Sequence, residues 1–186
     1  MTDKTKLTAS ITVQQAGRLA LRSKRYRKEQ SEYLEELRKE GLTQREARLE
    51  MARVRAEWWP PLEEVVAAAL DLRLAEPDLA GPWPELTEEE ELGMALSGRW
   101  PGPALPARLC QRNYLVPTDL VRRLRTASWR VSAEPLALLG DGGLVRVSHL
   151  PGNLQAERER LADLVHSPGR IVRQALDRYS IVEPNE

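Results

Sequence analysis

The stretch that decides the fold of this chain runs from residue 113 to 124 and reads Asn113-Tyr114-Leu115-Val116-Pro117-Thr118-Asp119-Leu120-Val121-Arg122-Arg123-Leu124. Its first part belongs to the apolar segment Leu109–Val116, which predicts a short strand that Pro117 ends. Thr118 is a good helix N-cap, and apolar residues follow it at helical spacing, at Leu120, Val121, Leu124, Ala127 and Val131. We expect Pro135 to close this helix. The stretch therefore predicts a strand that leads directly into an amphipathic helix.

Two further helices are predicted toward the C-terminus. A loop that contains Gly140, Gly142 and Gly143 precedes the first of them, which spans Leu154–Val165. Ser167-Pro168-Gly169 then opens a final helix over Arg170–Tyr179.

On the other side of the strand, residues 77–106 are rich in proline and acidic residues and predict a linker. Thr87 is a good N-cap for one short helix within this linker, Glu88–Leu96. The four glutamates that open that helix are expected to face solvent or, alternatively, to occupy basic surfaces of the protein itself. The linker divides the chain into a basic helical region, 1–76, and a C-terminal region, 107–186.

The N-terminal region predicts two or three helices in an antiparallel hairpin or small bundle. A helical pattern begins at Val13 and ends near Gly41, and Thr43 with Glu46 forms a capping box for a second helix that runs to about Trp59. The prolines at 60 and 61 end or kink that helix, and a third follows with apolar residues at 62, 65, 66, 70 and 74. Thr2–Thr12 is polar and β-branched and predicts a mobile arm or a short strand.

Charge is distributed unevenly along a chain whose formal net charge is zero. Residues 1–28 carry eight basic side chains and one acid, residues 77–98 carry six acids and no base, and residues 99–186 carry thirteen arginines and nine acids. Two basic ends therefore flank an acidic middle, and this distribution is more informative about partners than the net charge.

Composition excludes several classes of protein. No apolar run reaches the length of a membrane span and residues 1–10 are polar, so neither membrane insertion nor export is expected and we expect a cytoplasmic protein. Cys110 is the single cysteine, and with only His149 and His166 beside it the chain predicts no disulfide, no metal site and no cofactor. It holds no glycine-rich phosphate loop and no nucleophile with an activating partner, so we do not expect an enzyme.

The strand, the proline, the basic helix and the later helix that opens with a small residue together resemble the ribbon-helix-helix family of DNA-binding proteins. Asn113–Leu124 and Ser167–Tyr179 carry this resemblance. It implies that two chains pair their strands into an antiparallel ribbon that enters the major groove, while the helices interlock to form a homodimer or a higher oligomer. The expected fold is mainly α-helical, with an N-terminal helical hairpin or bundle and a ribbon-helix-helix-like unit containing one short strand.

Strand alternation assigns the faces of that strand. Tyr114 and Val116 are expected to point into the core, whereas Gln111, Asn113 and Leu115 point outward toward base edges. Asn and Gln can bond adenine in a bidentate manner, and Leu can contact a thymine methyl group. Arg112 falls on the inward face, which is unfavourable for a charge unless it lies at the frayed end of the strand.

The resemblance also implies sites for DNA phosphates. Ser167, Gly169 and Arg170 would offer a phosphate the free backbone N–H groups of a helix N-terminus, and Arg122 and Arg123 would extend these contacts. Additional contacts are predicted for a basic cluster near the N-terminus, which otherwise forms a solvated helix face: Arg18, Arg22, Lys24 and Arg25.

The chain departs from the family pattern because about thirty residues, Pro135–His166, separate the two helices of the unit. This insert is either a side excursion with its own helix or evidence that Leu154–Val165 is the true partner helix. The resemblance predicts a dimeric transcriptional repressor or a plasmid or mobile-element maintenance factor that binds double-stranded DNA. The alternative is a helical adaptor that binds proteins through residues 13–75.

Overall fold

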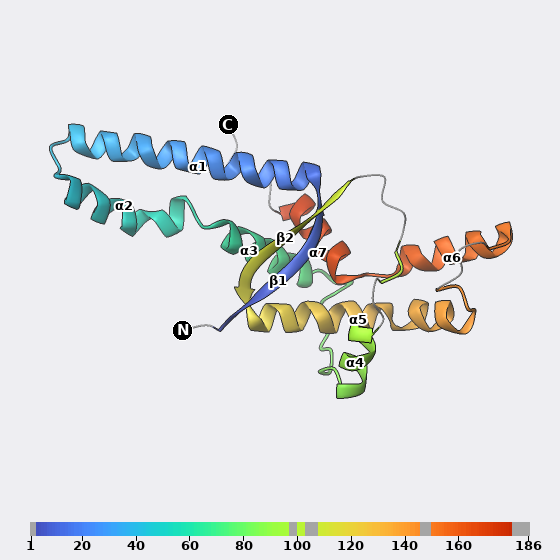
Figure 1. Ribbon diagram of the computed structural model, residues 1–186. Helices are drawn as coiled ribbons and strands as arrows, with labels where there is room; N and C mark the ends of the chain where they lie inside the picture. Colours follow the sequence, from blue (N-terminus) through green and yellow to red (C-terminus); the bar gives the residue numbers. More distant parts are fainter. Residues whose placement is uncertain (1–2, 97–99, 103–107, 146–149, 180–186) are drawn as a thin grey trace.

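The computed structural model describes residues 3–96, 100–102, 108–145 and 150–179. Helices dominate these residues, and two strands form a small antiparallel sheet (Figure 1). In chain order the elements are β1 (Lys4–Thr12), α1 (Val13–Lys39), α2 (Gln44–Trp58), α3 (Leu62–Leu74), α4 (Glu88–Leu96), β2 (Leu109–Pro117), α5 (Thr118–Asp141), α6 (Gly152–Leu164) and α7 (Pro168–Tyr179).

The two strands form a ribbon within one chain. β2 pairs with β1 in antiparallel register, from Lys4 opposite Pro117 to Thr12 opposite Leu109. The resemblance had implied pairing with a second copy of β2, and the structure instead supplies the partner strand from the chain's own N-terminus. For Thr2–Thr12 the sequence predicts a mobile arm or a short strand, and Lys4–Thr12 forms a strand.

Each strand buries one face because its side chains alternate. Leu7, Ala9 and Ile11 of β1 are buried, and so are Tyr114 and Val116 of β2, as the alternation predicted. Burial away from water raises the pKa of the Tyr114 hydroxyl above its ordinary value. The ribbon therefore has a core face and an outward face.

The short helices α3 and α7 pack against each other and cover the core face of the ribbon. Fully buried residues at this contact include Val66 and Leu70 from α3 and Val172 and Leu176 from α7. Leu19 of α1 and Leu124 of α5 complete the same cluster. The core thus joins residues from the 1–76 and 107–186 regions, which composition had separated.

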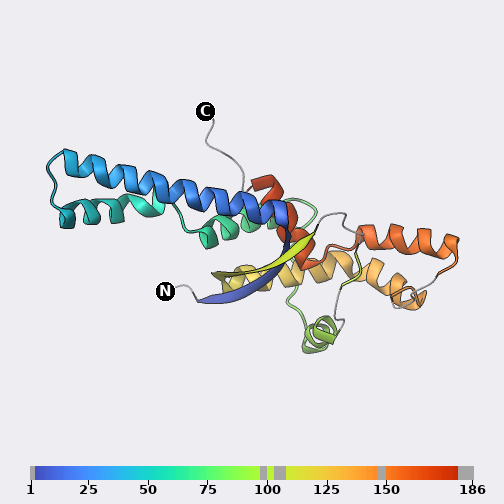
Figure 2. The ribbon, with the colours of Figure 1, turned by 45° about the horizontal axis from the view of Figure 1, so that its top comes forward.

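The helices α1 and α2 form a hairpin that extends from one end of this core (Figures 1 and 2). Capping boxes start both helices, at Thr12 with Gln15 and at Thr43 with Glu46, and the second of these was predicted. Aromatic packing holds the two helices of the hairpin together: the rings of Tyr33, Trp58 and Trp59 contact one another, with centroids 5.3 to 5.7 Å apart.

The helices α5 and α6 extend in the same way from the opposite end (Figure 2). Pro135 does not close α5, and that prediction is wrong: the helix continues to Asp141 with Pro135 buried inside it. The later turns are held by a second apolar cluster that joins Leu139 and Leu144 to Leu161 and Val165, which offsets the hydrogen bond that a proline removes. Thr118 is the first residue of α5 and not its cap, and its hydroxyl donates to the Asp3 carboxylate.

The acidic helix α4 begins where the sequence predicted, with Thr87 accepting a hydrogen bond from the Glu90 N–H. Glu90 then pairs with Arg130 of α5 at 2.5 Å. The backbone N–H of Thr87 and the Arg130 guanidinium lower the pKa of Glu90 below its ordinary value. At this glutamate the acidic run therefore contacts a basic side chain of the protein itself.

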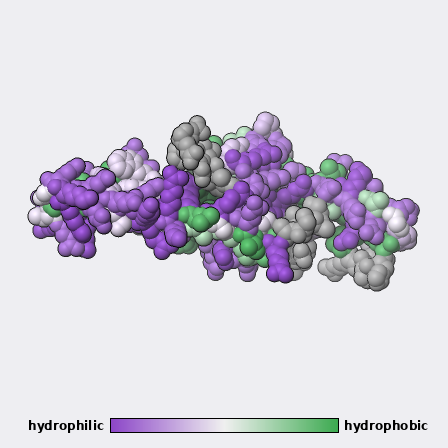
Figure 3. Space-filling view, turned by 90° about the horizontal axis from the view of Figure 1, so that it is seen from above, coloured by the Kyte–Doolittle hydropathy of each residue, from purple (hydrophilic) through white to green (hydrophobic). Residues whose placement is uncertain are grey.

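Seen from above, the surface is mainly hydrophilic and its apolar patches are small and separated (Figure 3). Within the described residues, none of the helices combines the length and the apolar character needed to cross a bilayer.

Candidate nucleic-acid interface

The outward face of the ribbon carries a row of polar side chains. In β1 the exposed residues alternate with buried ones, and in β2 the same alternation exposes every second residue. Together the exposed positions on this face are Lys4, Lys6, Thr8, Ser10, Leu109, Gln111, Asn113 and Leu115.

All three predicted base contacts lie on this face. Register places Gln111 opposite Ser10, Asn113 opposite Thr8, and Leu115 opposite Lys6. At the centre of the ribbon the Thr8 hydroxyl donates to the Asn113 carboxamide oxygen at 2.9 Å. Leu115 is 57% exposed, which is a large exposure for an apolar side chain on a strand.

The contribution of β1 to this face was not predicted from the sequence. The side chains of β1 that point outward are those of Lys4, Lys6, Thr8 and Ser10. The residues between them, Leu7, Ala9 and Ile11, are buried in the core. The strict period of two from Lys6 to Ile11 was the available signal for a strand with one polar face. What the sequence did not show is which strand lies beside it.

Arg112 shares the strand phase of the buried Tyr114 but is itself exposed. Its guanidinium donates to the carbonyl of Gln111 at 3.3 Å. The charge of Arg112 therefore stays in solvent. The unfavourable burial of this charge, which strand alternation would imply, does not occur.

The N-terminus of α7 lies beside the ribbon. Ser167 caps it, since its hydroxyl accepts from the Arg170 N–H at 3.3 Å. The Arg170 guanidinium turns back onto the carbonyls of Asp163 and Val165, and Arg173 from the next turn donates to the Ser10 carbonyl at 2.9 Å. Burial, together with the nearby charge of Arg170, lowers the pKa of Arg173 below its ordinary value.

Gly169 lies in the first turn of this helix, and an added Cβ there would meet the Arg173 guanidinium at 3.3 Å. The predicted trio Ser167, Gly169 and Arg170 lies together at the start of α7 because these residues are neighbours in sequence, and Arg173 makes the contact with the ribbon.

The other predicted phosphate contacts, Arg122 and Arg123, already bind carboxylates. Arg122 lies 2.6 Å from Asp119 and 3.3 Å from Glu85, and hydrogen bonding to Asp119 raises its pKa above the ordinary value. Arg123 pairs with Asp71 at 2.5 Å. A phosphate would have to replace these carboxylates.

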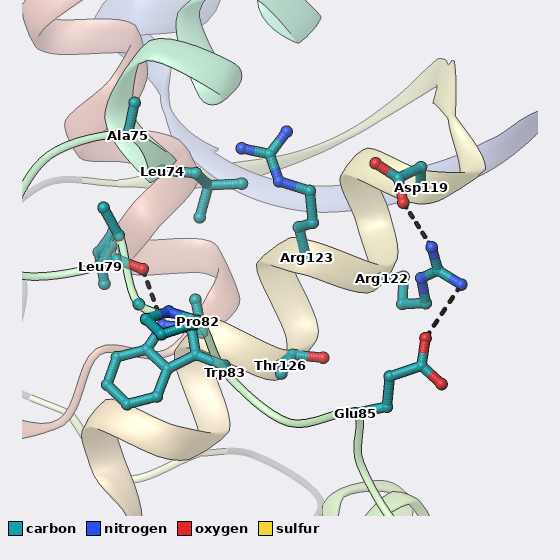
Figure 4. A pocket seen from close by; sticks show the side chains of 13 residues that line it. Leu74, Ala75, Leu79, Pro82, Trp83, Glu85, Asp119, Arg122, Arg123 and Thr126 are labelled. Carbon is teal, nitrogen blue, oxygen red and sulfur yellow. Dashed lines mark hydrogen bonds and ion pairs between the residues drawn. The ribbon is translucent and has the colours of Figure 1, made fainter.

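Both arginines line a cavity of about 610 Å³ between α5 and the segment 79–85 (Figure 4). Trp83 closes part of it, and the indole N–H donates to the Leu79 carbonyl at 2.8 Å. The acids Asp119 and Glu85 share this cavity with the arginines, so its charge is balanced.

Of the basic cluster on α1, three members contact other side chains. Arg18 pairs with Asp177 at 2.7 Å, Arg25 pairs with Glu29 at 2.7 Å, and Arg22 donates to the Tyr26 hydroxyl with its guanidinium 5.2 Å from that ring. Lys24 is exposed. Arg18 is thereby directed to the C-terminal part of α7.

The described residues contain no group of three side chains suited to hold a metal ion. Cys110 is half-buried on β2, and His166 lies at the start of α7; His149 falls outside the described residues.

Comparison of the chain with models of protein families, with curated proteins and with solved structures finds no match.

Proposed function

We propose that the chain is a sequence-specific double-stranded DNA-binding protein that places the outward face of its β1–β2 ribbon in the major groove. The observation that carries this proposal is a two-stranded ribbon that buries Leu7, Ala9, Ile11, Tyr114 and Val116 on its core face, while its other face exposes lysine, amide and hydroxyl groups. The arrangement fits the ribbon-helix-helix resemblance.

The dimensions of the ribbon suit this task. Paired strands lie about 4.8 Å apart, and with their side chains they fill a major groove about 12 Å wide. Gln111 and Asn113 supply the amide groups that bond adenine, Lys6 can donate to guanine oxygen and nitrogen, and Leu115 can contact a thymine methyl group.

Phosphate contacts would flank the reading face. At the N-terminus of α7 (Ser167, Gly169 and Arg170), a phosphate would meet the Gly169 N–H and the positive dipole end, because Pro168 has no N–H and the Arg170 N–H donates to the Ser167 hydroxyl. In this account Arg122 and Arg123 exchange their carboxylate partners for phosphates. The biological role would be that of a transcriptional repressor or a plasmid or mobile-element maintenance factor.

The test begins with selection of duplexes that have a randomised centre by the purified full chain. We expect one sequence to be enriched, and we expect Gln111→Ala/Asn113→Ala to lower affinity for it at least tenfold, since each good amide–base pair is worth about 1–3 kcal/mol. Affinity for random duplex should change little, because phosphate contacts supply non-specific binding.

The matched control is Asn153→Ala/Gln155→Ala, which removes the same two residue types from exposed positions on α6. It should leave the enriched sequence and its affinity unchanged. Equal losses in the two double variants would contradict the proposed reading face.

The alternative function, a helical adaptor, has one observation in its favour. Trp58 is 50% exposed on the α1–α2 hairpin, in a position where a protein partner could cover it. If selection enriches no duplex, the adaptor function becomes the better account.

A further inference from the structure

The chain builds the same succession of elements twice. A nine-residue strand leads without a loop into a long helix, a helix then returns alongside it, and a short helix packs on the ribbon. The first half is β1, α1, α2 and α3, and the second is β2, α5, α6 and α7. The insert that departs from the family pattern in the second half therefore has a counterpart in the first, and α6 is a side excursion while α7 is the core partner.

The halves are related by a pseudo-two-fold axis through the centre of the ribbon, where Thr8 pairs with Asn113. Each half lays its short helix on the strand of the other, since α7 packs against β1 and α3 against β2. The hydrogen bonds at the two ends of the ribbon also repeat. The Val13 N–H donates to the Arg108 carbonyl and the Thr118 N–H to the Asp3 carbonyl, both at 3.0 Å.

Sequence follows the same symmetry in the short helices. Residues 65–71 read Val-Val-Ala-Ala-Ala-Leu-Asp and residues 171–177 read Ile-Val-Arg-Gln-Ala-Leu-Asp, so four of the seven positions are identical. The buried positions coincide as well: Val65, Val66, Ala69 and Leu70 match Ile171, Val172, Ala175 and Leu176.

An ion pair between the halves occurs twice at equivalent positions. Arg18 is the sixth residue of α1 and pairs with Asp177 of α7, and Arg123 is the sixth residue of α5 and pairs with Asp71 of α3. Both aspartates close the repeated seven-residue segment. A shared fold, a shared segment and a shared cross-contact together indicate two diverged copies of one unit of a strand and three helices.

We infer that a single chain is a complete DNA-reading unit and that its target is a non-palindromic duplex bound in one orientation. This inference rests on the proposed function. With both strands of the ribbon present, no second copy is needed to complete the reading face, and the two chains that the resemblance implied become two halves of one.

The side chains at equivalent outward positions differ, which determines the symmetry of the target. Rotation about the axis exchanges Lys4 with Leu109, Lys6 with Gln111, and Ser10 with Leu115. Both ribbon lysines therefore lie in β1, toward one end of the face. A palindrome presents the same base edges to both halves, so it cannot suit lysine on one side and glutamine on the other.

The flanks of the ribbon differ in the same sense. The first turn of α3 contains Glu63 and Glu64, whereas the first turn of α7 contains no acid. The helix that attracts a phosphate is thus present on one side only, because acids at a helix N-terminus repel a second anion. This polarity supports a single binding orientation.

The experiment uses the full chain and the duplex enriched by selection. Sedimentation equilibrium of the complex should give one chain per duplex, and the enriched motif should lack two-fold symmetry. Two chains on a palindromic motif would overturn this inference and leave DNA binding standing, whereas failure to enrich any duplex would overturn the proposed function itself.

A variant tests the origin of the asymmetry. Lys6→Gln makes the two equivalent positions the same residue type, so a repeated selection should give a motif more symmetric at the base pairs that face them. Lys39→Gln, at the far end of α1, should leave the motif unchanged. The contradicting result is an enriched motif that is the same for Lys6→Gln as for the parent, when both proteins unfold at the same temperature. The ribbon residues would then not determine the asymmetry of the target.

Discussion

At the start of α7 the imidazole of His166 is held half-buried against the core. The backbone N–H of His166 donates to the Ser132 hydroxyl at 2.9 Å, and its backbone carbonyl accepts from the Ser128 hydroxyl at 2.6 Å, so the backbone is fixed from α5. The ring Nδ1 is buried and has no hydrogen-bond partner among the described residues. Burial, with the charge of Arg170 added, lowers the pKa of His166 below its ordinary value, although Asp78 acts in the opposite direction.

This shift predicts a pH dependence of stability. The folded state binds the His166 proton more weakly than the unfolded state, whose pKa is about 6.5, so the free energy of unfolding should fall as pH drops below that value. Urea unfolding at pH 8 and pH 5.5 would show it, with His166→Gln losing less stability between the two pH values than the parent. An equal loss in both proteins would contradict a depressed pKa.

Residue-level prediction from sequence succeeded where local alternation decides the outcome. Gln111, Asn113 and Leu115 could be placed outward and Tyr114 and Val116 inward because one face of a strand must be apolar. Lys4 and Lys6 were missed because their role depends on pairing with a strand 105 residues away in sequence, at the Thr8–Asn113 pair. No local pattern specifies such a partner.

At the scale of elements, the sequence predicted helices best where caps and prolines mark their ends. The helix Glu88–Leu96 was predicted at its observed bounds, and the capping box at Thr43 starts α2 as expected. The prediction that Pro135 ends α5 is wrong, because packing of Leu139 against α6 stabilises the turns of α5 that follow Pro135. Pairing of β1 with β2 is a property of the whole core, and composition alone suggested separate regions.

The contact between α3 and α7 should carry much of the stability. Leu70→Ala and Leu176→Ala each leave a cavity at a fully buried equivalent position, so each should lower the free energy of unfolding by about 2–5 kcal/mol. Denaturant unfolding measures both. The control is Leu72→Ala in α3, whose side chain is 54% exposed and should matter far less. If Leu72→Ala cost as much as Leu70→Ala, the assigned core face of α3 would be wrong.

At the scale of the molecule, both halves share one core and should fold together. A fragment of residues 107–186 lacks β1 and α3, which cover β2 and α7, and so should show little cooperative unfolding by circular dichroism. Mixing it with a fragment of residues 1–106 should restore helix content and a sharp transition. A sharp transition in 107–186 alone would support two independent domains instead.

The most direct test of the central claim, that the outward face of the ribbon contacts DNA, is the salt dependence of duplex binding. Each lysine that neutralises a phosphate contributes about 0.9 to the magnitude of the slope of log K against log salt. Lysines in the major groove also lie in the electrostatic field of the phosphates, so we expect them to contribute to this slope. We expect Lys4→Ala/Lys6→Ala to lower the slope by up to about two, and Lys28→Ala/Lys39→Ala on α1 to leave it unchanged. A slope that falls only in the α1 variant would contradict the ribbon as the DNA-binding surface.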